Sequence, residues 1–194
     1  MIAGHFGLAA GVKAREQTVP LWALMLATQW LDVVFVPLFM AKVETIEVIG
    51  GGPAGYGNGI IHADYTHSLM GAIALAALFG LAAGLRWGRR AAGILGAVVF
   101  SHWILDLLVH RHDMPIWPGA PAGAMHVGLG LWRWPLLTAA AELALVLWGG
   151  LTYFRAAVGV ARAHDPAKIR RARIAGATVI AAGLVTLGLG VAGL

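Results

Sequence analysis

The sequence contains no cysteine and carries little charge. Without cysteine the chain forms no disulfide, and any metal site must use histidine, carboxylate or backbone oxygen ligands. Charged residues make up 12% of the 194 residues, compared with about 25% in a typical soluble domain. Hydrophobic residues reach 59% and the mean hydropathy is +0.77. A chain with so few polar residues cannot cover a water-soluble fold, so the composition indicates an integral membrane protein.

Several motifs of soluble enzymes are also missing. The glycines between positions 50 and 59 predict a loop and not a phosphate cradle, because no Lys-Ser/Thr pair follows them. Neither a Gly-x-Ser-x-Gly elbow nor a His-Glu-x-x-His motif occurs. The net charge is +5. In a membrane protein, however, an excess of basic residues reflects the orientation in the membrane more often than nucleic-acid binding. We therefore expect no nucleic-acid partner.

Long apolar runs are what the chain has instead. Five of them reach the roughly 20 residues that cross a bilayer core, and they are 19–40, 66–85, 91–110, 131–154 and 174–194. A shorter apolar segment, 2–12, precedes them. The third, fourth and last spans are dense in Gly and Ala, which let membrane helices pack closely. The sequence predicts an all-α fold: a polytopic transmembrane helical bundle with five clear spans plus a short N-terminal hydrophobic helix, in one integral-membrane domain over 1–194.

The basic residues predict the orientation of this bundle. Five spans would place eleven of the fourteen Lys and Arg residues on one side, namely Lys13, Arg15, Arg86, Arg89, Arg90, Arg155, Arg162, Lys168, Arg170, Arg171 and Arg173. Basic residues favour the cytoplasmic side, so segments 42–65 and 111–130 should face outward from a cell inner membrane. Segment 2–12 either lies in the cytoplasmic interface or crosses, and crossing would bring His5 to the outer side. Asp165-Pro166 is typical of a helix N-terminus.

A stripe of ionisable residues lies in the third span. His102, Asp106 and His110 are spaced i, i+4 and i+8, which keeps them within about 80° of one another on a helix. Ionisable groups are costly in a bilayer and need partners. A divalent cation would satisfy all three; the alternatives are a hydrogen-bonded packing network or, for His110, an interfacial position.

Further candidates lie at or near the outer ends of other spans. His62, Asp64 and His67 precede the second span, where Asp64 is either functional or the helix N-cap. Asp32 is in the middle of the first span, and it is either functional or a hydrogen-bonded residue that holds helices together. Glu142 is also in a span and is a ligand, a general base or a structural polar group.

The remaining histidines are weaker candidates. His126 faces outward and could add to a metal site. His112 and Asp113 are expected to be solvated loop residues, and His164 is expected to lie on the inner surface.

The order of these motifs resembles a known family. Gly4-His5, Asp32, Thr66-His67-Ser68-Leu69, Ser101-His102-x3-Asp106 and Pro115-x-Trp117-Pro118 occur in this order within roughly 1–120. This pattern resembles the membrane-bound metal-dependent hydrolases of the DNA-damage-inducible inner-membrane protein type, which are distantly like the zinc-dependent phospholipase C and P1 nuclease enzymes. The resemblance implies that His5, Asp32, His67, His102 and Asp106 bind metal. The family often has Asp-x-Asp-His where this chain has Asp32-Val33-Val34-Phe35, which implies fewer metal ions.

Together these observations predict a membrane-embedded metal-dependent hydrolase. Its helices with metal ligands would lie within 1–126 and its last spans within 131–194. The divalent metal, zinc by preference, would be bound by His5, Asp32, His67, His102 and Asp106, with His62, His110 and His126 as further candidates. Asp64 or Glu142 would be the catalytic general base. The substrate would be a phosphoester or lipid-linked molecule at the outer face, among the membrane lipids. Rival interpretations are a proton- or metal-ion-coupled transporter and a structural protein with packed polar residues.

Overall fold

The computed structural model describes residues 1–49, 58–120 and 123–193, and within them the fold is mostly helical. The α-helices, in chain order, are α1 (Ile2–Arg15), α2 (Leu21–Thr28), α3 (Trp30–Met40), α4 (Leu69–Val109), α5 (Pro135–His164) and α6 (Ile169–Ala192). Two short 3-10 helices, η1 (Leu131–Arg133) and η2 (Pro166–Lys168), precede α5 and α6.

Two short β-hairpins correct the prediction of an all-α fold. Strand β1 (Thr45–Val48) pairs antiparallel with β2 (Gly59–His62), and β3 (Met114–Pro115) pairs with β4 (His126–Val127). Backbone groups outside the helices need hydrogen-bond partners, and the β-branched residues of these segments suit strands. The glycine-rich segment predicted to be a loop lies outside the described residues up to position 57, and Gly59 begins β2.

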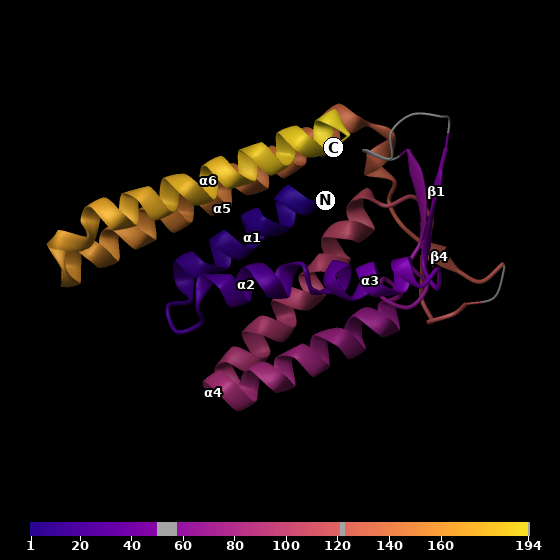
Figure 1. Ribbon diagram of the computed structural model, residues 1–194, viewed down its shortest axis with the longest axis horizontal. Coiled ribbons are helices and arrows are strands. Elements are labelled where there is room, and N and C mark those ends of the chain that lie inside the picture. The colour runs from indigo at the N-terminus through magenta and orange to yellow at the C-terminus, as the bar shows by residue number, and fades with distance from the viewer. Residues whose placement is uncertain (50–57, 121–122, 194) are drawn as a thin grey trace.

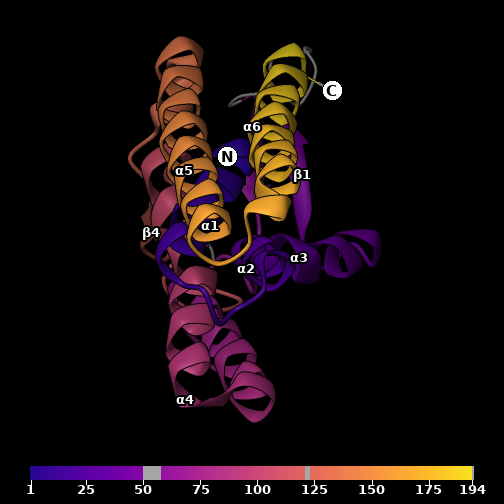
Figure 2. The ribbon, with the colours of Figure 1, turned by 90° about the vertical axis from the view of Figure 1, so that its left-hand side faces the viewer.

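The helices form layers that do not follow the chain order. Helices α5 and α6 lie side by side along one face, α1 and α2 form the middle, and α4 covers the opposite face (Figures 1 and 2). Helix α1 is therefore packed between α5 and α2, and α2 lies between α1 and α4. This arrangement brings the N-terminal helix, with His5, into the interior of the bundle.

Helix α4 folds back on itself at Gly88, which has φ 84° and ψ 173°. The two arms pack closely through small residues, because a Cβ on Gly80 would lie 2.8 Å from the Ala92 carbonyl oxygen. The spans expected at 66–85 and 91–110 are the two arms of this single element. A positive φ of this kind favours glycine, and the tight turn leaves no separate loop between the arms.

The number of candidate spans is three or four, and not the five expected. Helices α4, α5 and the stretch Pro166–Ala192 are each long and apolar enough to cross a membrane. The segment expected as the first span is instead a pair, α2 and α3, bent by 50° at Gln29, and it makes a fourth span only when the pair is counted as one. Neither half of the pair is long enough alone.

The predicted N-terminal helix is present as α1, with 14 residues. Its length of about 21 Å is shorter than the roughly 30 Å hydrocarbon core. It crosses α5 at glycines: a Cβ on Gly7 would lie 2.5 Å from the Leu145 backbone, and one on Gly149 would overlap the Gly7 carbonyl group. The close approach that small residues predicted therefore occurs between α1 and α5.

The end of α1, the turn of α4 and the connection between α5 and α6 lie at one end of the molecule (Figure 1). The Glu16 carboxylate accepts a hydrogen bond from Arg90 Nε at 3.1 Å, which joins the loop after α1 to the α4 turn. Hydrogen bonds from the Thr18 hydroxyl and amide lower the pKa of Glu16 to about 2. Asp165 caps η2 by accepting from Ala167 N, as predicted. The eleven basic residues lie in or near the three connections named above, at the end of the molecule opposite the strands.

Candidate metal centre

The second arm of α4 carries the predicted stripe. His102, Asp106 and His110 are all buried; His102 contacts Thr28 and Asp32, and Asp106 contacts His5 of α1. The break at Gln29 places Thr28 and Asp32 against this stripe, and the His102 Nδ1 atom lies 2.7 Å from the Thr28 carbonyl oxygen. The bend that shortens the expected first span is therefore also the feature that positions Asp32.

His67 approaches the stripe from the other arm of α4, one residue before the helix cap. Ser68 is the N-cap and accepts a hydrogen bond from Gly71 N at 3.1 Å, so Asp64 does not cap this helix. The indole Nε1 of Trp103 donates to the His67 carbonyl oxygen at 2.9 Å. The backbone of His67 is thereby tied to the same arm that carries His102.

Four donor atoms from three separate segments converge at the centre of this cluster. They are Asp32 Oδ1, His67 Nε2, His102 Nε2 and Asp106 Oδ2. The two imidazole nitrogens are 3.3 Å apart. Each lies between 2.9 and 3.7 Å from the two carboxylate oxygens. A tetrahedral site with bonds of about 2.0–2.1 Å has donor separations of about 3.3–3.4 Å, which the separation of the two imidazole nitrogens matches. The sets in which all donor atoms lie close to one another have three members each: Asp32, His67 and His102, and His5, His102 and Asp106.

The hydrogen-bond network determines the tautomer of His102. The Thr28 carbonyl oxygen can only accept, so Nδ1 of His102 must be the protonated nitrogen. In the neutral ring, Nε2 then presents a lone pair to the cluster. A backbone carbonyl in this role is a common way of orienting a metal-binding histidine.

His67 is oriented by a relay that begins at Glu44. The fully buried Glu44 carboxylate accepts hydrogen bonds from the amides of Tyr65 and Thr66 and from the Thr66 hydroxyl, each at 2.8 Å. Because that hydroxyl donates its only proton to Glu44, it must accept from His67 Nδ1, 2.9 Å away. Nε2 of neutral His67 is therefore also a lone-pair donor toward the cluster.

These assignments leave four electron-pair donors and no proton among them when both rings are neutral. Two lone pairs at 3.3 Å and two carboxylates repel one another unless a metal cation lies between them or one ring takes up a second proton, which His102 Nε2 would donate to Asp106 at 2.9 Å. Nitrogen and oxygen donors of this kind suit zinc and other divalent transition metals. The residues present therefore fit a metal ion: Asp32, His67 and His102 form one group that could hold it, and His5, His102 and Asp106 form another.

His5 contacts the far side of Asp106. Its Nε2 lies 3.1 Å from Asp106 Oδ1, and its ring stacks on His102 with centroids 3.9 Å apart. The amino group of Met1 lies 3.8 Å from the same oxygen. The buried Nδ1 of His5 has no hydrogen-bond partner in the described part of the chain. The structure thus places His5 with the other predicted ligands, on the side of the molecule that its crossing was expected to reach.

His110 and Asp113 form a dyad beside the cluster. His110 Nδ1 lies 3.0 Å from Asp113 Oδ1, and His110 Nε2 lies 3.8 Å from Asp106 Oδ2. The other Asp113 oxygen accepts from Ile61 N, which ties the dyad to β2. Asp113 is buried, so the expectation that it is solvated is wrong, whereas His112 is exposed as expected.

The other candidates lie apart from the four central donors. Glu142 is buried in α5 and accepts from Gly4 N at 3.0 Å. His62 is on β2, 3.7 Å from Glu47, and His126 is on β4 with its Nδ1 near the Ala124 carbonyl. Among the described residues, no hydrogen bond or ion pair links the Asp64 side chain to the cluster. The catalytic roles of Asp64 and Glu142 stay predictions.

Sequence reasoning missed Glu44 and the pairing of Asp113. Both are carboxylates in connections between helices, where an acidic residue is usually solvated. His110-x-x-Asp113 spacing offered a local signal for the pairing, but the 21 residues between Glu44 and Thr66 are bridged only by the fold.

Access to the centre is through Asp32. Its side chain is 39% exposed, whereas those of His5, His67, His102 and Asp106 are at most 5% exposed. The centre is therefore enclosed by buried side chains, and Asp32 is its most exposed member.

Comparisons of the chain with protein-family models, with curated proteins and with solved structures gave no match.

Proposed function

We propose that this protein is a membrane-embedded, metal-dependent hydrolase of phosphoester bonds in amphiphilic substrates. The observation that carries the proposal is the pair of buried groups that share His102, Asp32 with His67 and His5 with Asp106, each with three donor atoms close enough to hold a metal ion. His102 and Asp106 lie on α4, which is long and apolar enough to cross a membrane. The resemblance to membrane-bound metal-dependent hydrolases implies the same ligands.

Each residue has a defined part in this proposal. Asp32, His67, His102 and Asp106 would hold the metal, and His5 would hold Asp106 in place or bind a second ion. A bound divalent metal supplies a Lewis acid and makes a water molecule acidic enough to attack near neutral pH. His110 would accept the proton at Nε2, because its Nδ1 proton points to Asp113. We favour His110 over Asp64 and Glu142 because it lies beside Asp106.

The proposed substrate class follows from the residues around Asp32, the most exposed member of the centre. Asp32 lies in α3, and Val33, Val36, Phe39 and Met40 of the same helix are exposed. Val36 is one turn from Asp32 and so shares its face. Exposed apolar side chains beside a recessed carboxylate suit a molecule with a polar head and an apolar tail. A lipid or lipid-linked phosphoester has both parts and is available at the membrane surface.

The test measures metal content first and hydrolysis second. The protein would be purified in mild detergent without a metal-affinity tag, and zinc, manganese, iron, nickel and cobalt would be measured by mass spectrometry. We expect at least one metal ion per chain, lost in the His102→Ala/Asp106→Ala double variant. The metal-loaded protein would then be tested on chromogenic phosphoesters and on phospholipids in micelles.

Two variants separate catalysis from structure. His110→Gln should retain the metal and lose most of the hydrolysis, by about a hundredfold or more for a general base. His126→Gln, outside the cluster, should change neither. Wild-type protein without metal after incubation with zinc would refute the proposal. Bound metal without hydrolysis, together with zinc flux into proteoliposomes, would favour the transporter instead.

A further inference from the structure

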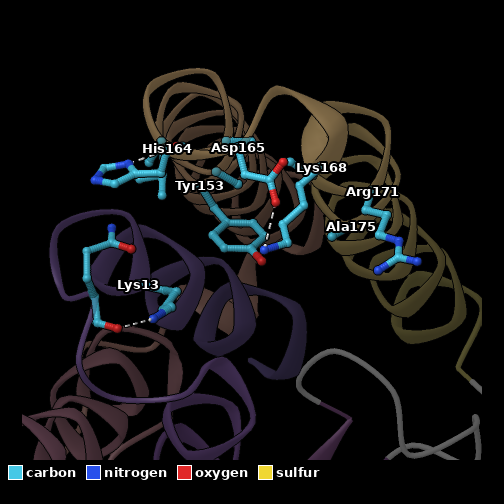
Figure 3. Close-up of a pocket in the computed structure, with 13 residues that line it drawn as sticks. Lys13, Tyr153, His164, Asp165, Lys168, Arg171 and Ala175 are labelled. Carbon is cyan, nitrogen blue, oxygen red and sulfur yellow. Dashed lines mark hydrogen bonds and ion pairs between the residues drawn. The ribbon is translucent and has the colours of Figure 1, made fainter.

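A second polar site lies at the other end of the molecule from the metal centre. A pocket of about 450 Å³ opens between the end of α1, the last turns of α5 and the start of α6. Figure 3 shows Lys13 facing Tyr153 of α5, with Lys168 and Arg171 on the far wall. His5 and Lys13 are on the same helix, about 12 Å apart along its axis, so this pocket is distinct from the metal centre.

The pocket exists because α5 is longer than α1. The two helices run in the same direction, since Gly4 contacts Glu142 and Gly11 approaches Trp148. Helix α1 ends at Arg15, whereas α5 continues to His164. Past the end of α1, the walls of α5 and α6 are small apolar residues, which are Ala156, Ala157, Val160, Ala161, Ala172 and Ala175. An apolar recess therefore remains where α1 stops.

The rim of this recess is basic. Lys13, Lys168 and Arg171 are positively charged, and the one acidic group, Asp165, is paired with Lys168 at 2.9 Å. Lys13 Nζ donates to the carbonyl oxygens of Gln17 and Val19, which leaves one of its three donors for a ligand. Within the described residues, neither Arg171 nor the Tyr153 hydroxyl has a hydrogen-bond or ion-pair partner. The pocket thus combines unpaired donors with an excess of positive charge.

We infer that this pocket binds one anionic phospholipid of the inner leaflet. Its phosphate would lie among Lys13, Lys168 and Arg171, with the Tyr153 hydroxyl as a further donor. Its glycerol and upper acyl chains would lie on the alanines of α5 and α6. The inference is independent of the hydrolase proposal, because no ligand of the metal centre lines the pocket.

Charge and position both favour a lipid over a soluble anion. The pocket belongs to the end that carries the eleven basic residues, which the orientation rule assigns to the cytoplasmic side. Basic residues next to membrane helices attract anionic lipids in that leaflet. A free phosphate would use the rim and leave the alanine walls exposed, whereas a lipid covers both.

The test compares lipid binding to matched variants of the full chain in detergent. Protein stripped of lipid would be titrated with phosphatidylglycerol or with phosphatidylcholine, and bound lipid would be counted by native mass spectrometry. We expect wild-type protein to retain one phosphatidylglycerol and little phosphatidylcholine. Lys13→Gln/Arg171→Gln should weaken phosphatidylglycerol binding by about tenfold or more.

Two further variants distinguish the pocket from a charged surface. Arg155→Gln/Arg173→Gln removes the same charge from the same end without touching the pocket and should bind nearly as well as wild type. Ala157→Leu keeps every charge and fills the recess, and it should weaken binding as strongly as the loss of the two basic residues. Circular dichroism and gel filtration would confirm that each variant is folded.

Three kinds of result would overturn the inference. The first is equal retention of phosphatidylglycerol and phosphatidylcholine by the wild type. The second is an equal loss of binding in Arg155→Gln/Arg173→Gln, which would indicate general attraction to a basic surface. The third is normal binding by folded Ala157→Leu, or displacement of the lipid by inorganic phosphate, which would place the anion on the rim alone.

Discussion

At the scale of single residues, the candidate metal centre depends on groups outside the set of proposed ligands. Thr28 and Thr66 direct the rings of His102 and His67, and Glu44 directs Thr66. Each histidine can bind metal through Nε2 only while its Nδ1 carries the proton. Partners of this kind typically change metal affinity by about 10–100-fold when they are lost.

Glu44→Gln should weaken metal binding through a change of tautomer. The new amide NH2 group would donate to Thr66 Oγ1, whose proton would then turn toward His67 Nδ1 and leave the proton of that ring on Nε2. We expect zinc affinity to fall by about 10–100-fold, measured by competition with a coloured chelator.

Two other variants control this prediction. Glu47→Gln removes an exposed carboxylate of β1 and should have no effect, whereas Thr66→Val should reproduce the loss. Unchanged zinc affinity in folded Glu44→Gln would mean that the relay does not orient His67.

At the scale of elements, the centre depends on how closely α1 lies against α5. Helix α1 has too few residues to cross the bilayer core on its own, so its position is determined by packing. Gly7 and Gly149 allow the two backbones to touch, and this contact holds His5 beside Asp106.

Gly149→Leu should therefore separate α1 from α5. The added side chain would overlap the Gly7 carbonyl group, and overpacking of this kind costs about 1–3 kcal/mol. We expect a lower thermal midpoint and a reduced metal content, because His5 moves with α1.

Gly159→Leu is the matched control, since a Cβ there meets nothing within 4 Å. It should leave both the thermal midpoint and the metal content near the wild-type values. Equal thermal midpoints for Gly149→Leu and Gly159→Leu would show that the backbones of α1 and α5 are not in close contact.

At the scale of the whole molecule, the ends of the bundle differ in chemistry. Both hairpins lie at one end of the molecule, and the turn of α4 and the connection between α5 and α6 lie at the other (Figure 1). The candidate metal centre borders the His110–Asp113 pair, which is tied to β2, whereas the proposed lipid pocket is lined by the end of α1 and the connection between α5 and α6. The basic end is expected to face the cytoplasm.

This orientation can be tested with single cysteines, because the natural chain has none. Met125→Cys, in an exposed outer connection, should react with an impermeant thiol reagent in intact cells. Ala163→Cys, near the end of α5, should react only after the membrane is broken. The reverse pattern would place the metal centre on the cytoplasmic side and contradict the orientation.

Composition and residue spacing alone predicted a membrane protein and identified most of the side chains of the candidate centre. Charge content predicted membrane helices, and the cost of placing His and Asp in lipid singled out His67, His102 and Asp106 as residues that need partners. Such inferences succeed because hydrophobicity and helical periodicity are properties of neighbouring residues. Asp32 was singled out in the same way, by its position in the middle of the first expected span, whereas His5 joined the group as a ligand through the family resemblance.

Only the tertiary structure decided the features that depend on distant segments. The bend at Gln29 divides the first expected span into α2 and α3, and the described helices give three or four candidate spans in place of five. Hydropathy measures apolar length and does not detect where a helix breaks. Glu44 precedes Tyr65 by 21 positions, and only the fold brings its carboxylate to Tyr65 and Thr66, through which it orients His67. The proposed lipid pocket forms where α5 continues past the end of α1. The sequence by itself determined which residues are costly to bury, and the packing of the helices determined which partners they find.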